Sequence, residues 1–450
     1  MNYSVETIAK FVGGKSSISI PGCEISSIQF DHRNAHERGT MFIAIKGQKN
    51  DGHTFIPELI KHGVYNFIVT DQSWIDQYEK SANFIHINDP VVALQALAQA
   101  HRTRFDIPII GITGSNGKTV IKEWLNSLLE GEFRICRSPK SFNSQVGVPI
   151  SVSLLKKNDT LAVFEAGIST TGEMEPLARM IQPTIGVFTN LGDAHDAGFS
   201  DRYEKLSEKI QLFRSANQVV VCSDQLWYLN HSADFDLNYF TWSQSDRKAD
   251  VYIASVNVKS SKTEISLEFD RQVYHLEIPF GDRASIENAI HCFCACLLLN
   301  VDISRITQRF KTLSAVAMRM EIKRGIENTI IVDDSYNSDL GSLNAALEQL
   351  TSIDSKGYMA VISDLVQNTN DKDIYMEMAE RFNDVGVQDV VLVGDEIAKH
   401  HALFKAERIL RVKSVDDFID QLPRIELRDK AILIKGARAF KFERLVKFLQ

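Results

Sequence analysis

The sequence is poor in the residues that mark secreted and membrane proteins. Only six cysteines occur in 450 residues, and their spacing forms no disulfide framework, which favours a reducing cytoplasm. No apolar run approaches the length of a membrane span, so membrane insertion is not expected. The opening segment MNYSVETIAKFVGG lacks a basic stretch followed by an apolar core, so no secretory signal is predicted. These absences predict a cytoplasmic location.

The chain also has fewer basic than acidic residues. Lys and Arg number 50 against 58 Asp and Glu, a formal net charge of −8 that argues against nucleic acid as a partner. An anionic ligand must then be met by local basic clusters. The 44% hydrophobic content is that of an ordinary globular protein, and the length predicts two to four domains.

Three of the cysteines, Cys292, Cys294 and Cys296, alternate inside NAIHCFCACLLLN, a pattern that predicts a buried helix. Helical geometry turns positions two apart to different faces, so core packing is favoured over a metal site.

Strand and helix patterns alternate along most of the chain. Residues 1–105 mix short strands, at 41–47 and 65–71, with helix-like segments. In residues 106–315, apolar β-branched runs separated by helical patterns predict a doubly wound parallel sheet. These runs are LAVFEAG (161–167), TIGVFTN (184–190) and QVVVC (218–222).

The sequence pattern changes between residues 250 and 280, where apolar and polar residues alternate in three short runs. These runs predict a small antiparallel meander attached to that sheet. Strand–helix alternation resumes over residues 316–450, which predicts a third, Rossmann-like domain with a mostly parallel sheet. The expected fold class is therefore α/β with three domains: a smaller one at 1–105, a central one at 106–315 and a C-terminal one at 316–450.

The central region opens with the glycine-rich stretch GITGSNGKT (111–119), which lies between an apolar run and a helical pattern. Strand, glycine loop and helix are the context of a phosphate loop, in which Lys118 reaches the outer phosphates and Thr119 ligates Mg²⁺. The outer glycine is Gly111, where the strict spacing would place it at Ile112. The alternative is a Gly-Lys-Thr turn without a ligand, but the flanking strand and helix favour a nucleoside triphosphate.

Polar side chains follow several strands of the predicted sheet. Glu165 ends an apolar strand, the position of a carboxylate that holds Mg²⁺ beside a phosphate loop, although a strand-end acid is as often a surface residue. His195 follows the next strand, and a lone histidine is more often a loop or core residue than a ligand. Lys209 lies in a helix whose expected buried face is Tyr203, Leu206, Ile210 and Phe213, and by spacing alone it is a solvated lysine.

Taken together, these motifs resemble the Mur ligase family, and within it the F-type enzymes. The resemblance spans nearly the whole chain. Besides the phosphate loop, it rests on FDHR (30–33), GQKNDGHTF (47–55), FNSQVGVP (142–149), the stretch from Glu165 to His195, KIQLF around Lys209, DDSYN (333–337) and KGARAFKFE (435–443).

The resemblance implies an ATP-dependent amide ligase that joins D-alanyl-D-alanine to UDP-N-acetylmuramoyl-tripeptide through an acyl phosphate. It implies an N-terminal UDP-substrate-binding domain, a central ATP-binding domain and a C-terminal ligase domain. It also implies two Mg²⁺ ions and a carbamylated Lys209. Some members are fused to an alanine racemase, so fusion to, or cooperation with, such an enzyme is a further implied partnership.

Site residues follow from the matched motifs. Those implied for catalysis are Lys118, Lys209 and His195, and those for metal are Thr119, Glu165, His195 and Lys209. Those for ATP are Thr113, Gly114, Ser115, Asn116, Gly117, Lys118, Thr119, Asn288, Arg319 and Asp334. Those for the peptide and uridine substrates are Arg33, Lys46, Asp51, His53, Asn143, Asn337, Lys435 and Arg438.

The chain departs from the family pattern at three places: Ala284–Ser285, Ser338–Leu340 and ISDLVQ (362–367). The open alternatives are a sister ligase with the same chemistry, such as the diamino-acid-adding type or folylpolyglutamate synthase, and a nucleotide-gated regulatory protein that has lost catalysis. The Asp-Asn-Pro-Arg token of the diamino-acid type is absent from the sequence, and the intact loop lysine and metal residues disfavour an inactive relative.

Overall fold

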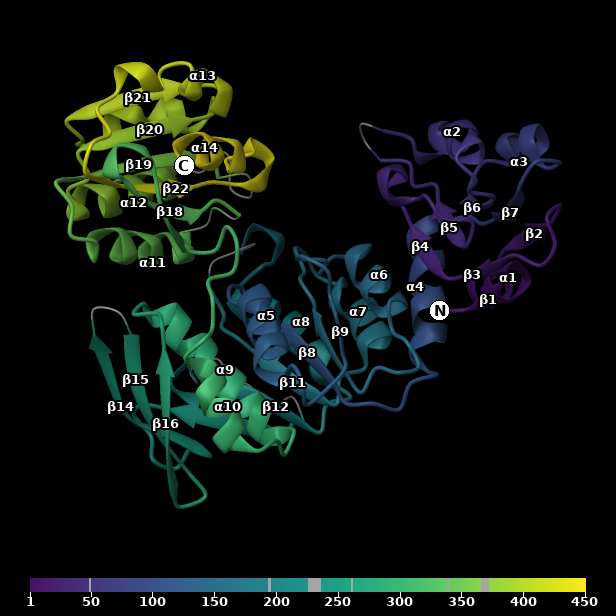
Figure 1. Cartoon of the computed structure of the whole chain (residues 1–450), viewed down its shortest axis with the longest axis horizontal. Helices are drawn as coiled ribbons and strands as arrows, with labels where there is room; N and C mark the ends of the chain where they lie inside the picture. Colours follow the sequence, from purple (N-terminus) through teal and green to yellow (C-terminus); the bar gives the residue numbers. More distant parts are fainter. Residues whose placement is uncertain are drawn as a thin grey trace.

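The computed structural model describes residues 1–47, 50–192, 196–225, 236–259, 262–336, 338, 340–365 and 372–450. These residues form three lobes, each built on its own main sheet (Figure 1). The purple lobe contains the N-terminus, the teal lobe lies in the middle and the green-to-yellow lobe contains the C-terminus. The expected three-domain α/β architecture is confirmed.

The N-terminal sheet has five strands in the order β2–β7–β6–β5–β4. Strands β4 to β7 are parallel, and β2 pairs antiparallel with β7 at the edge. The bounds are β2 (Lys15–Ser17), β4 (Ser27–Gln29), β5 (Thr40–Ile43), β6 (Asn66–Val69) and β7 (Asn83–His86), with α1 (Val5–Val12), α2 (Ile56–Lys61), α3 (Gln72–Tyr78) and the small pair β1 (Tyr3–Ser4) and β3 (Glu24–Ile25). The strands predicted at 41–47 and 65–71 are confirmed, with shorter bounds.

Helix α4 (Pro90–Arg102) leads from the first lobe into the second and packs against both. Its Leu94 and Leu97 share a core with Ile8 of the first lobe and with Ile150 of α6 (Gly147–Ser153) in the second. His101 near its end is buried, and its ring nitrogens contact the Tyr3 hydroxyl at 2.7 Å and the Leu155 carbonyl at 3.0 Å. The contact between these two lobes therefore has a packed apolar core.

The central sheet has nine strands in the order β16–β15–β14–β13–β12–β11–β8–β10–β9. The seven neighbouring strands β14, β13, β12, β11, β8, β10 and β9 run parallel to one another. At the other end of the sheet, β14, β15 and β16 form the predicted antiparallel meander. The bounds are β8 (Ile109–Thr113), β9 (Ile135–Arg137), β10 (Leu161–Glu165), β11 (Ile185–Phe188), β12 (Gln218–Cys222), β13 (Tyr239–Ser243), β14 (Val251–Lys259), β15 (Lys262–Phe269) and β16 (Gln272–Ile278).

Helices cover both faces of this sheet, which explains why its strands read as unbroken apolar runs. Successive residues alternate between two cores: Ile110 and Ile112 join one, and Ile109 joins the other. The first core lies under α5 (Lys118–Leu129), α9 (Arg283–Leu298) and α10 (Ile303–Phe310), and the second under α6, α7 (Met174–Ile181) and α8 (Arg202–Ile210).

The C-terminal sheet has the order β17–β18–β22–β19–β20–β21, with only β17 antiparallel. Its two faces also carry separate cores. The bounds are β17 (Glu321–Arg324), β18 (Ile330–Asp334), β19 (Gly357–Ser363), β20 (Asp389–Val393), β21 (Arg408–Val412) and β22 (Lys430–Lys435), with α11 (Leu340–Thr351), α12 (Lys372–Val385), α13 (Val415–Ile419) and α14 (Glu443–Leu449).

The cysteine-rich stretch is a buried helix, as predicted. Cys292, Cys294 and Cys296 of α9 are fully buried in the first core, and all six cysteines of the chain are free thiols. Burial raises the pKa of the Cys292 and Cys294 thiols well above the ordinary value and that of Cys296 to about 12. Among the helices of the described residues, none is both long and apolar enough to cross a bilayer.

Two interior histidines predict a loss of stability in mild acid. Burial lowers the pKa of His101 and of His291 to about 4, whereas an unfolded histidine titrates near 6.5. Between these values the unfolded chain binds protons that the folded chain does not, so stability falls as the pH falls from 6.5 to 4. The loss is up to about 3 kcal/mol per histidine.

Urea unfolding followed by circular dichroism at pH 7.5 and pH 5 measures this loss. His101→Gln is expected to reduce the difference between the two pH values, because the amide cannot take up a proton. Substitution of the exposed His62 by Gln serves as the control and is expected to leave the difference unchanged. An equal difference in wild type and His101→Gln would contradict the prediction.

Candidate nucleotide and metal site

The glycine loop lies between β8 and α5, as predicted from the sequence. Gly114 and Gly117 have φ of +140° and +85°, conformations that side chains disfavour. A Cβ at Gly114 would lie 2.0 Å from the Thr189 hydroxyl, and one at Gly117 would lie 2.4 Å from the Asn288 amide oxygen. Both positions therefore need glycine, and Asn288 of α9 packs directly against the loop.

The loop is held in shape by the chain that follows β11. The Ser115 N–H donates to the Asn190 carbonyl at 2.9 Å, and the Asn116 N–H donates to the Asn190 side-chain oxygen at 3.1 Å. On the other side, the Thr113 hydroxyl donates to the Ala166 carbonyl at 2.9 Å, just after β10. Lys118 folds back over the loop, and its amine donates to the carbonyls of Gly114 and Ser115 at 2.7 and 2.9 Å. The cradle is thus held by contacts within the chain, with the lysine amine on the loop itself.

A hydroxyl and a carboxylate meet beside the loop. The Thr119 hydroxyl donates to Glu165 Oε2 at 2.8 Å and lies 3.0 Å from the Ser141 hydroxyl. Glu165 is fully buried, so the surface interpretation of this residue is wrong. Its Oε1 atom has no hydrogen-bond partner in the described part of the chain. Hard oxygen donors with an open buried carboxylate oxygen fit the ligand preferences of Mg²⁺.

Lys209 lies on the other side of the loop, and its placement corrects the solvated-lysine expectation. The side chain is 1% exposed, and its amine donates to the Gly114 carbonyl at 3.3 Å. Burial, followed by the charges of Lys118 and Lys205, lowers the pKa of Lys209 well below its ordinary value. The helical face was also partly wrong: Tyr203, in the first turn of α8, is exposed.

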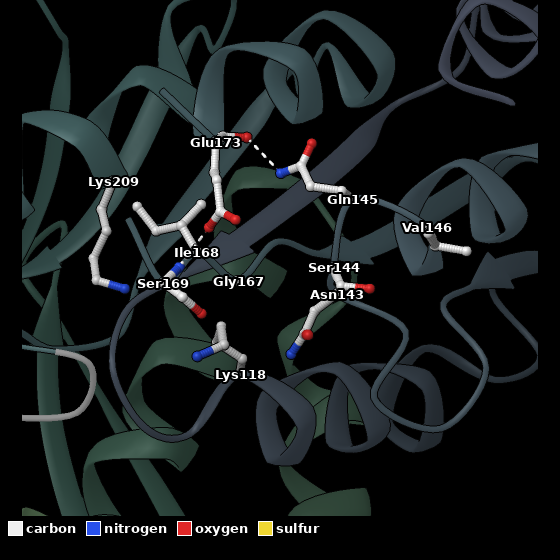
Figure 2. A pocket seen from close by; sticks show the side chains of 10 residues that line it. All are labelled: Lys118, Asn143, Ser144, Gln145, Val146, Gly167, Ile168, Ser169, Glu173 and Lys209. Carbon is white, nitrogen blue, oxygen red and sulfur yellow. Dashed lines mark hydrogen bonds between the residues drawn. The ribbon is translucent and has the colours of Figure 1, made fainter. Parts of the chain in front are cut away.

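A pocket of about 350 Å³ lies beside the phosphate loop, with Lys118 and Lys209 in its lining. Figure 2 shows Lys118, Lys209 and Asn143 around it, from three separate segments. Gln145 and Glu173 complete one wall: the Gln145 amide donates to the Glu173 carbonyl at 2.7 Å, and the Glu173 carboxylate accepts the Ser169 N–H at 2.6 Å. The pocket therefore presents two lysine amines to a ligand beside the phosphate loop.

In the C-terminal lobe, two residues implied for different ligands contact each other. The Lys435 amine, which is buried at the end of β22, lies 2.6 Å from the Asp334 carboxylate at the end of β18. The Arg319 guanidinium stacks 4.0 Å from the centre of the Tyr336 ring, and the exposed Arg438 lies 5.4 Å from it. Lys435 and Arg438 are thus at the strand end that the sequence predicted, but Lys435 has an ion-pair partner.

The N-terminal candidates divide into exposed and interior side chains. Arg33 is exposed and paired with Asp31 at 2.6 Å, and Lys46 is exposed. His53 is buried, with Nδ1 2.6 Å from Asp51 and Nε2 accepting the Thr70 N–H at 3.1 Å. Asp51 and His53 therefore order their loop through contacts within the lobe. His195 and Asn337 lie outside the described residues.

Several residues of this site were missed by sequence reasoning, namely Lys122, Ser141, Gln145, Glu173 and Asn190. Lys122 had a signal, since it lies one helical turn after Lys118 on the same face of α5. The others are polar loop residues that only the fold brings to the pocket.

Known proteins match the chain over nearly its whole length. The sequence pattern of the Mur ligase middle domain matches residues 112–296, and that of the Mur ligase, glutamate ligase domain matches residues 318–438. The chain is 25% identical to the UDP-N-acetylmuramoyl-tripeptide–D-alanyl-D-alanine ligase of Bacillus subtilis (strain 168) over 460 residues, which cover 99% of this chain and 98% of that protein.

Solved structures with the same fold span the chain as well. MurF from Acinetobacter baumannii gives a TM-score of 0.83 at 21% identity, with 99% of this chain and 98% of that chain covered. MurF ligase from Thermotoga maritima in complex with ADP gives 0.76 at 22% identity, with 94% and 96% covered. The two sequence patterns together cover more than half of the residues, and the chain belongs to the Mur ligase family.

Proposed function

We propose that this chain is an ATP-dependent ligase that adds D-alanyl-D-alanine to UDP-N-acetylmuramoyl-tripeptide in the cytoplasmic stage of peptidoglycan synthesis. The observation that carries the proposal is the meeting of Lys118 of the phosphate loop and the buried Lys209 at one pocket, with the hydrogen-bonded Thr119–Glu165 pair beside the same loop. The named relatives support the choice of substrates.

The reaction has two steps. An oxygen of the tripeptide carboxylate attacks the γ-phosphorus of ATP, and the bond from that phosphorus to ADP breaks, which gives an acyl phosphate. The amine of the dipeptide then attacks the acyl carbon through a tetrahedral intermediate, phosphate leaves with its oxygen, and the nitrogen loses a proton. Two anions must approach each other in the first step, so neutralising their charge is the main task of the site.

Lys118 would contribute to that task. Its amine contacts two loop carbonyls, and a bound phosphate would compete for the same donors. The backbone of residues 113–117 would line the phosphates at the start of α5, where the helix dipole favours an anion.

Thr119 and Glu165 would hold one Mg²⁺, and His195 together with a carbamylated Lys209 would hold a second. Bound magnesium supplies positive charge that screens the phosphates from the substrate carboxylate. Carbamylation of Lys209 needs a neutral amine, and the lowered pKa of this buried side chain supports that state. The product is an anionic oxygen ligand, stabilised by the neighbouring positive charges of Lys118 and Lys205.

The remaining nucleotide contacts would come from Asn288, Arg319 and Asp334. We assign the three domains to 1–105, 106–315 and 316–450, with ATP in the cleft between the second and third. Closure of that cleft would complete the site and exclude water from the acyl phosphate. The contact of Asn288 with Gly117 supports its assignment.

The substrate contacts are assigned by lobe. The N-terminal loops containing Arg33, Lys46, Asp51 and His53 would hold the uridine diphosphate, with the exposed Arg33 and Lys46 as the direct contacts. Asn143 would meet the reacting end in the pocket. Asn337, Lys435 and Arg438 would face the peptide, which requires the Asp334–Lys435 pair to open.

Phosphate release from ATP, with mass analysis of the product, tests the proposal. The assay contains purified protein, Mg²⁺, UDP-N-acetylmuramoyl-tripeptide and D-alanyl-D-alanine. Release that needs both substrates and yields the pentapeptide is the expected result. Release with another amine would redirect the assignment to a sister ligase, and no release with any muramoyl or folyl acceptor would favour a regulatory relative.

A further inference from the structure

Lys122 is an interior lysine beside the carboxylate assigned to magnesium. Its side chain is 0% exposed, although lysine is rarely buried without partners. The amine donates to the Ser138 carbonyl at 2.8 Å and also to the Lys140 carbonyl. It lies 3.0 Å from Glu123 Oε1 and 3.6 Å from Glu165 Oε1. The charge is therefore shared between two carbonyls and two carboxylates.

The distances distinguish the partners in direct contact with the Lys122 amine from Glu165, which lies farther away. A lysine ammonium has three N–H donors; two go to the Ser138 and Lys140 carbonyls, and Glu123 Oε1 lies at ion-pair distance, 3.0 Å away. Glu165 Oε1, at 3.6 Å, lies beyond hydrogen-bond distance and still within reach of the charge. Lys122 therefore compensates the negative charge of Glu165 without occupying the lone pairs of its open oxygen.

The same amine also holds a segment that lines the pocket. Lys140 has φ of +49°, a left-handed conformation that non-glycine residues seldom adopt, and its carbonyl points to Lys122. The next residue, Ser141, contacts the Thr119 hydroxyl, and Asn143 lines the pocket. Loss of the Lys122 amine would release the backbone that carries both side chains.

We propose that Lys122 is a positioning residue for the magnesium site, which keeps one oxygen of Glu165 open for the ion and fixes residues 138–144 around it. The proposal rests on the proposed function only in placing Mg²⁺ at Thr119 and Glu165. Lys122 acts through Glu165 and through this segment, and it does not touch the substrates.

Lys122→Met tests the proposal by removing the charge at nearly constant side-chain volume. With ADP present, the affinity for Mn²⁺ used as a probe of the magnesium site is expected to fall by about 10- to 100-fold, as for lost supports of metal ligands. Hydrogen exchange of residues 138–144 is expected to accelerate, and the affinity for ADP without metal is expected to change less than about twofold. Electron paramagnetic resonance, exchange mass spectrometry and calorimetry give these three readouts without any ligase substrate.

Two further variants separate positioning from a loss of folding. Lys122→Gln keeps a donor for the Ser138 carbonyl and is expected to lose Mn²⁺ affinity with a smaller loss of stability. The exposed Lys157→Met is the matched control and is expected to behave as wild type. Lys122→Met and Glu165→Gln should be non-additive, because the lysine acts through the carboxylate.

Folded Lys122 variants with wild-type Mn²⁺ affinity and exchange rates would overturn the proposal, and so would additivity with Glu165→Gln. A wild-type protein that binds ADP but no Mn²⁺ would instead overturn the magnesium assignment, and with it this role of Lys122. A wild-type protein that binds ADP and Mn²⁺ but shows no ligase activity would count against the proposed function alone.

Discussion

Lys209→Ala is expected to lower ligase activity by at least about 100-fold, because the change removes the amine that would carry the carbamate ligand. The wild-type side chain is 1% exposed and lies between the phosphate loop and the pocket. Truncation to alanine leaves space where the carbamate oxygens would lie. A short carboxylate such as acetate, at high concentration, is therefore expected to restore part of the activity.

Phosphate release under saturating ATP, with and without acetate, measures this effect. Lys209→Arg is the matched control, since the guanidinium keeps the bulk, cannot be carbamylated and leaves no space for acetate. It is expected to be as inactive as Lys209→Ala and to show no rescue. Full activity of Lys209→Ala without added acid would eliminate the carbamate role.

Gly114→Ala is expected to weaken ADP binding by about 100-fold, equivalent to about 3 kcal/mol. The residue has φ of +140°, and the added methyl group would lie 2.0 Å from the Thr189 hydroxyl. The loop backbone must shift to relieve this contact, and the N–H groups that would line the phosphates shift with it. Isothermal titration calorimetry with MgADP measures the change.

Gly172→Ala separates the steric contact from backbone strain alone. Gly172 also has a positive φ, of +84°, but a Cβ there meets nothing within 4 Å. This control is expected to lose some stability and to keep its nucleotide affinity. If Gly114→Ala binds ADP within about twofold of wild type, the loop geometry does not set the affinity.

The strands were predictable because they are buried on both faces, so that apolar residues fill them without interruption. Ile109, Ile110 and Ile112 illustrate this pattern, since they divide between two cores. The glycine loop was predictable because its special backbone needs glycine at positions close together in the sequence.

The burial of Lys209 could not be predicted from the helical spacing of apolar residues. A helical face was inferred from the apolar residues alone, yet α8 also buries Lys205, Glu208 and Lys209. These polar residues are buried because the phosphate loop and neighbouring segments cover them, and no local pattern encodes that contact. Only the family resemblance marked Lys209, and the helical spacing of Lys122 from Lys118 indicated their shared face of α5 but not the carboxylates that surround Lys122.

In the C-terminal lobe, an ion pair between two candidate site residues also could not be predicted from the sequence. Asp334 and Lys435 lie 101 positions apart in the sequence, and their ion pair results from the parallel register of β18 and β22. Motif matching assigned the two residues separately, to nucleotide and to peptide. The pairing links these assignments, because a ligand that binds either residue meets the charge of the other.

The buried thiols of α9 make this helix an internal reporter of opening in the central lobe. Thiol reagents react with the thiolate, which burial disfavours at Cys292, Cys294 and Cys296. Labelling of these positions therefore requires α9 to separate from the sheet, and its rate follows the free energy of that opening. Because Asn288 of the same helix packs on Gly117, we expect a nucleotide bound at the phosphate loop to slow the labelling of these core thiols.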